Sequence, residues 1–83
     1  MSKEKLLKDI KEIANNYDWL VVEDIYTENK HIYGSNTEYD NIKYGGGKFA
    51  IIDTNEIKAD YILFNEQYNT VEEFVDIILE YWN

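Results

Sequence analysis

Hydrophobic residues recur at helical spacing near both ends of the chain, whereas its middle contains short segments rich in β-branched and aromatic residues. In the first part, apolar residues three or four positions apart predict a helix over residues 3–16, with Ser2 as its N-cap. The stripe that this helix is expected to bury consists of Leu6, Leu7, Ile10, Ile13, Ala14 and Tyr17. Residues 15–18 are expected to end the helix, because asparagine tolerates the left-handed conformation that follows many helices.

Two segments after this helix are rich in β-branched and aromatic residues and predict strands. Residues 19–27 predict a first strand. Residues 31–33 predict a short second strand that stops at Gly34 and Ser35, because glycine and serine favour turns. His31 is then expected to be a half-exposed strand residue.

A hairpin pattern follows later in the chain. Residues 48–53 and 57–64 predict two strands, and residues 54–56 have the length and chemistry of the turn between them. Before this hairpin, residues 35–47 predict a polar loop that ends in three consecutive glycines. A loop of this length in a small domain is usually functional or disordered. Its segment 39–44 is a candidate edge strand.

The last periodic segment predicts a C-terminal helix over residues 70–82, opened by the capping-box pattern of Thr70 and Glu73. The residues expected to face the core are Val71, Phe74, Val75, Ile78 and Trp82. The order of elements predicts an α+β fold with an N-terminal helix, a three- to four-stranded antiparallel sheet and a C-terminal helix. The length predicts a single α+β domain over residues 1–83.

Acidic residues greatly outnumber basic residues. Seventeen aspartates and glutamates oppose eight lysines and no arginine, and the formal charge is −9. Nucleic acids and anionic membranes are recognised by clusters of lysine and arginine, so direct binding to either is not expected. The charge favours a basic protein partner. The alternative is that the charge only keeps a small protein soluble and monomeric.

The acidic residues of the final helix form a row, and no lysine within the helix balances them. Glu72, Asp76 and Glu80 lie four residues apart, which places them on one face at intervals of about 6 Å. The helix dipole stabilises the first-turn carboxylates but opposes Glu80. We therefore interpret Glu72, Glu73, Asp76 and Glu80 as a partner-binding face. The interval resembles the spacing of successive phosphates on a nucleic-acid strand, which is the geometry expected of a DNA mimic.

Tyrosines interleaved with acidic residues in the polar loop form a second candidate surface. Exposed aromatic residues are favoured interface anchors because they bury a large area at a low entropic cost. The predicted contact residues here are Glu38, Tyr39, Asp40 and Tyr44, beside Tyr33. The alternative is that one or two of these tyrosines fold over the core.

Residue types used in catalysis and metal binding are scarce. Cysteine is absent and His31 is the only histidine, which argues against a zinc site or a histidine-activated nucleophile. Residues 45–48 differ from a phosphate-binding P-loop because Phe49 and a predicted strand follow the lysine. Carboxylate pairs are too numerous to single out an acid and a base. We expect no enzyme, no catalytic residues, no cofactor and no bound metal.

The small size, the acidic helix-sheet-helix layout and the acidic, tyrosine-bearing loop resemble the small inhibitors that phages use against host defence, anti-CRISPR proteins among them. Acidic immunity proteins that plug nucleases are similar in the same respects. This resemblance is at the level of class and involves no diagnostic motif. It implies a protein that occludes a basic nucleic-acid-binding surface of a host nuclease or Cas effector, in the host cytoplasm if the chain is encoded by a phage.

Two other interpretations stay open. In the first, a self-associating structural or interaction protein without enzymatic activity buries Ile77, Leu79, Tyr81 and Trp82 against a second copy. In the second, carboxylates bind Mg²⁺ or Ca²⁺, although their spacing differs from that of an EF-hand. The charged N-terminal segment lacks the apolar stretch of a signal peptide or membrane span, and the absence of cysteine fits a reducing compartment. A cytoplasmic monomer or homodimer is expected.

Overall fold

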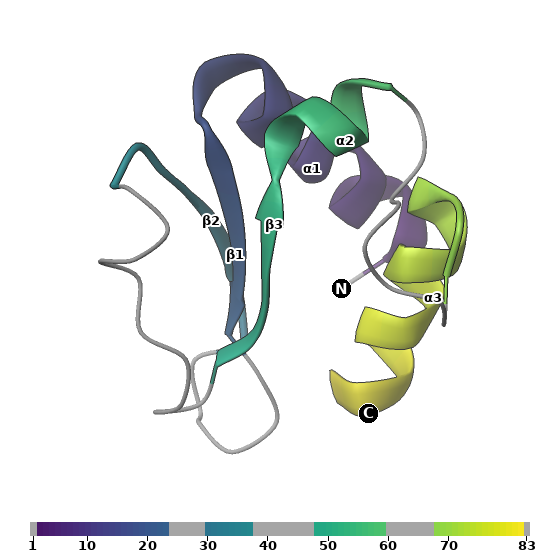
Figure 1. Cartoon of the computed structure of the whole chain (residues 1–83). Coiled ribbons are helices and arrows are strands. Elements are labelled where there is room, and N and C mark those ends of the chain that lie inside the picture. The colour runs from purple at the N-terminus through teal and green to yellow at the C-terminus, as the bar shows by residue number, and fades with distance from the viewer. Residues whose placement is uncertain (1, 24–29, 38–47, 60–67, 83) are drawn as a thin grey trace.

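The computed structural model describes residues 2–23, 30–37, 48–59 and 68–82 of the 83-residue chain (Figure 1). Its elements, in chain order, are α1 (Lys3–Asn16), β1 (Trp19–Glu23), β2 (Ile32–Ser35), β3 (Lys48–Asp53), α2 (Thr54–Lys58) and α3 (Val71–Trp82). The predicted α+β fold is confirmed, with an N-terminal helix, an antiparallel sheet and a C-terminal helix. The sheet has three strands in the described segments.

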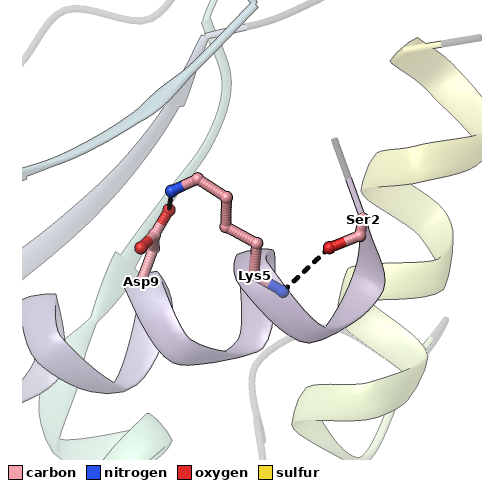
Figure 2. Close-up of polar contacts among 3 residues, drawn as sticks. All are labelled: Ser2, Lys5 and Asp9. Atoms are coloured by element: carbon pink, nitrogen blue, oxygen red, sulfur yellow. Dashed lines mark hydrogen bonds and ion pairs between the residues drawn. The ribbon is translucent and has the colours of Figure 1, made fainter.

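α1 begins at the predicted cap. The hydroxyl of Ser2 accepts a hydrogen bond from the Lys5 backbone N–H at 3.2 Å, and Lys5 Nζ pairs with Asp9 Oδ2 at 3.0 Å (Figure 2). The helix ends at Asn16, and its C-cap, Tyr17, is extended, with φ −136° and ψ 160°. The expected left-handed helix end is therefore wrong, because β1 begins after only two connecting residues and the chain must already be extended.

β1 is the central strand, and it pairs antiparallel with β2 on one side and with β3 on the other. Side chains alternate along a strand, so Leu20 and Val22 face the helices while Val21 points to the other side of the sheet. Ile52 of β3 joins the helix-facing side. Residues 24–27 of the predicted first strand lie outside the described residues.

β2 includes the two residues that were expected to end it. Gly34 pairs with Leu20 of β1, and Ser35 pairs with Trp19, so the strand runs to Ser35. A Cβ atom added at Gly34 would collide with the ring of Tyr17 and lie 2.8 Å from its Cβ. Gly34 is therefore a site of close packing, where the tyrosine ring occupies the space of a missing side chain.

β3 leads into a helix, and the predicted hairpin is wrong. α2 follows directly after Asp53, whose carboxylate caps it by accepting a hydrogen bond from the Asn55 backbone N–H at 2.8 Å. Ile57, expected to start a strand, is a buried helical residue. Residues 60–64 of the predicted strand lie outside the described residues.

Thr54 attaches α2 to the connection between α1 and β1. This residue is 1% exposed, and its backbone N–H donates to the Asp18 carbonyl at 3.0 Å. Its hydroxyl lies 2.6 Å from the Tyr17 carbonyl and 3.0 Å from that of Asp18. These contacts fix the first turn of α2 beside the start of β1, which is why the chain turns into a helix here.

α3 packs on the same side of the sheet as α1 (Figure 1). The residues buried together by the helices and the sheet are Leu6, Ile10, Ala14, Leu20, Val22, Ile52, Ile57, Tyr68, Val71, Phe74, Val75 and Ile78. Trp82 packs against this core as predicted, and its Nε1 donates to the Glu23 carbonyl at 3.0 Å. The rings of Tyr68 and Phe74 lie 5.0 Å apart, which joins the start of α3 to the core.

Candidate partner-binding face

α3 divides into a buried side and an acidic side. Val71, Phe74, Val75 and Ile78 are at most 1% exposed, as predicted, and they fix the orientation of the helix. The other side carries four exposed carboxylates: Glu72, Glu73, Asp76 and Glu80. We call these four residues the α3 acidic face. Their surroundings differ, and three electrostatic environments can be distinguished along the helix.

The middle of the α3 acidic face is already paired with a cation. Lys3 Nζ lies 3.0 Å from Asp76 Oδ1, and the two side chains are 45% and 60% exposed, respectively. The pair joins the first residue of α1 to the centre of α3. No lysine within α3 balances the row, as the sequence shows, but Asp76 is paired with a lysine from another helix.

Glu73 has a structural role at the start of the helix. Its backbone N–H donates to Thr70 Oγ1 at 3.2 Å, and its Oε2 accepts from the Asn69 backbone N–H at 2.8 Å. The predicted capping box is present in this form, with the carboxylate reaching the residue before the cap. The negative charge also lies where the helix dipole favours it, so helix stability alone accounts for Glu73.

Glu72 and Glu80 occupy the two ends of the face. No cation pairs with either carboxylate within the described segments. They are eight residues apart, which is about 12 Å along the helix axis. Glu72 lies in the first turn, where the dipole favours it, whereas Glu80 lies in the last turn, which contains no basic residue of its own.

The apolar residues considered for self-association point in different directions. Ile77, Leu79 and Trp82 pack against the core of their own chain. Tyr81 is 50% exposed. Contact with a second copy through this set would therefore depend mainly on Tyr81.

Glu23, at the end of β1, is the centre of a polar cluster that local sequence patterns do not reveal. Its carboxylate lies 3.7 Å from Nδ1 of His31, and its carbonyl accepts the hydrogen bond from Trp82. Lys30 Nζ donates to the Trp82 carbonyl at 3.0 Å and so places a cation at the C-terminal end of α3. Burial and, secondarily, the charge of Glu23 raise the pKa of Tyr33. These contacts tie the end of α3 to the sheet, and we interpret them as structural.

The second candidate surface belongs to the predicted loop between β2 and β3. Its residues Glu38, Tyr39, Asp40 and Tyr44 lie outside the described residues, as does the candidate edge strand. His31 is described: it directly precedes β2, with its side chain 49% exposed.

Other chemistry is not evident in the part of the chain that the structure describes. It contains no group of three or more histidine, aspartate or glutamate side chains placed to hold a metal ion. No helix in the described ranges is long and apolar enough to cross a membrane. An open groove of about 350 Å³ between α1 and α2 is lined by Lys11, Ala14, Asn15, Ile57 and Lys58, a set without a carboxylate or a histidine to act as a base.

Comparisons of the chain with protein-family models, with curated proteins and with solved structures gave no match. Among the described residues, those of the α3 acidic face give the clearest indication of a ligand type, because exposed carboxylates on a fixed helix attract cationic groups.

Proposed function

We propose that the protein is an acidic inhibitor without enzymatic activity, which binds a basic protein and occludes the surface where that protein binds nucleic acid. The α3 acidic face provides the contact in this proposal, together with the loop residues Glu38, Tyr39, Asp40 and Tyr44. The partner is a host defence nuclease, such as a Cas effector, and the site of action is the cytoplasm. The protein itself contacts neither nucleic acid nor membrane.

The position of Glu80 is the observation that carries the proposal. Its side chain is exposed, no cation pairs with it in the described segments, and it lies near the C-terminal end of α3. A carboxylate there is disfavoured by the helix dipole, by about 0.3 to 1 kcal/mol. Lys30 places a cation at this helix end but bonds the Trp82 carbonyl, not Glu80. The dipole therefore does not account for Glu80, and contact with a cationic partner would.

The nature of the partner follows from the charge and the spacing of the face. Carboxylates at intervals of about 6 Å along a helix match a surface whose lysines and arginines are arranged for successive phosphates. The net charge of −9 adds long-range attraction toward such a surface. Association is then expected to be fast and sensitive to salt.

Charge reversal at the two ends of the face tests the proposal. The double variant Glu72→Lys/Glu80→Lys leaves the Asp76 ion pair and the Glu73 cap in place. Glu4→Lys/Glu12→Lys is the matched control, since these exposed glutamates of α1 are also eight residues apart and Glu4 also lies in a first turn. Both variants change the net charge equally, so a difference between them reports on position.

The wild-type protein and both variants are immobilised, exposed at low salt to a bacterial lysate freed of nucleic acid, and eluted with salt for mass spectrometry. We expect a basic nuclease to be retained by the wild type and by the α1 variant, but not by the α3 variant. Equal retention by the two variants would show that the α3 acidic face is ordinary solvated surface. Retention of no nuclease by any of them would refute the inhibitor proposal.

A further inference from the structure

We propose that Lys3 competes, within the same chain, with cations of the partner for the α3 acidic face. Its ammonium group pairs with the Asp76 carboxylate, so a lysine or arginine of the partner must displace it before Asp76 can contribute to binding. This inference rests on the proposed function, since it concerns the regulation of the same surface. Lys3 belongs to α1, so the sequence of α3 alone gives no indication of this role. The competition also implies that part of the affinity for a basic partner is suppressed within the free protein.

The geometry of the pair supports this role. Lys3 Nζ and Asp76 Oδ1 are 3.0 Å apart, so the face already holds a primary ammonium group at its centre. Lys3 is the first residue of α1, and the Ser2 cap and the buried Leu6 fix the backbone around it. The lysine is thereby kept within reach of α3.

The exposure of the pair makes displacement easy. With the side chains 45% and 60% exposed, the ion pair is screened by water and contributes little to stability. While Lys3 is in place, Glu72 and Glu80 are the members of the row with which no cation of the described residues pairs, and they lie about 12 Å apart along the axis. When Lys3 leaves, Asp76 restores a continuous row with intervals of about 6 Å.

Affinity for a defined cationic probe tests the inference. Fluorescein-labelled nona-arginine is titrated at low salt with the wild type, with Lys3→Gln and with the control Lys5→Gln, and binding is followed by fluorescence anisotropy. Lys5 is a suitable control because it forms a 3.0 Å ion pair with Asp9 on α1, and its loss changes the net charge equally. Lys3→Gln is expected to bind about 1.5 to 5 times more tightly than Lys5→Gln, which is the range for one exposed ion pair. Lys3→Arg keeps the pair and is expected to bind like the wild type.

The same comparison in an Asp76→Asn background separates displacement from general electrostatics. If Lys3 competes at Asp76, the advantage of Lys3→Gln over Lys5→Gln disappears when the carboxylate is absent. Equal affinities of the two lysine variants with Asp76 intact, or an advantage that persists without it, would overturn the inference. Thermal unfolding of each variant verifies that the compared proteins are folded.

The proposed function is tested separately, by measuring the affinity of the charge-reversal variants for the same nona-arginine probe. If Glu72→Lys/Glu80→Lys binds nona-arginine as tightly as Glu4→Lys/Glu12→Lys, the α3 acidic face is not a cation-binding surface and both proposals fail. If only the α3 reversal weakens binding while Lys3→Gln equals Lys5→Gln, the face remains and the role of Lys3 is refuted.

Discussion

Gly34 and Tyr17 show how single residues determine the packing of this small sheet. The ring of Tyr17 lies against the backbone of Gly34, where a Cβ atom would collide with it. We predict that Gly34→Ala lowers the free energy of unfolding by about 1 to 3 kcal/mol, the usual range for overpacking. Urea denaturation followed by tryptophan fluorescence measures this change.

Tyr17, the residue with which an added Cβ would collide, provides the control for this prediction. Replacing Tyr17 by alanine removes the two nearest ring atoms but keeps the Cβ at 2.8 Å. Gly34→Ala is therefore expected to cost less, but not nothing, in the Tyr17→Ala background. A Gly34→Ala protein as stable as the wild type would contradict the packing seen here. Equal costs in the two backgrounds would show that the glycine is needed for another reason.

Among the helices and strands, those specified by a pattern within one segment could be predicted from the sequence. Those that depend on contacts between distant segments could not. The periodicity of residues 3–16 and 70–82 predicted both long helices, and the hairpin pattern predicted the strand at 48–53 but not the helix that follows it. The strand expected from Ile57 is part of α2. A local signal existed, because Asp53 followed by Glu56 has the spacing of a helix cap. The bonds from Thr54 to the α1–β1 connection link distant parts of the chain and leave no such signal.

The two ends of α3 are predicted to respond oppositely to the loss of a glutamate. Glu73→Ala removes the acceptor for the Asn69 N–H and a charge favoured by the dipole, so unfolding should become easier by about 1 kcal/mol. Glu80→Gln removes a charge that the dipole opposes, and should stabilise the protein by roughly 0.3 kcal/mol or more. Chemical denaturation of both variants at low salt measures the two changes.

High salt is the internal control for this pair, because the dipole contribution at Glu80 is screened whereas the hydrogen bond at Glu73 persists. A destabilising effect of Glu80→Gln would contradict the account. It would mean that the Glu80 carboxylate stabilises the fold, so that its position would no longer support a cationic partner.

In the molecule as a whole, the two long helices differ in charge: α1 contains four lysines and three acidic residues, whereas α3 contains four acidic residues and no lysine. α1 contains Lys5 paired with Asp9 on its own surface, whereas Asp76 of α3 depends on Lys3 from α1. The row of carboxylates on α3 could be predicted from sequence, since it follows from spacing alone. Its partial neutralisation could not, since that requires the relative placement of two helices. Glu72 and Glu80, which pair with no cation in the described part of the chain, remain the surface on which we propose that a basic partner binds.

Competition with nucleic acid tests whether the protein occupies a nucleic-acid-binding surface of its partner. A labelled DNA or RNA duplex is bound to the nuclease recovered by capture, and the protein is added while the anisotropy of the nucleic acid is followed. We predict that the wild type and Glu4→Lys/Glu12→Lys release the nucleic acid, and that Glu72→Lys/Glu80→Lys does not. Nucleic acid that stays bound while the wild-type protein joins the complex, or release by both variants alike, would contradict the account.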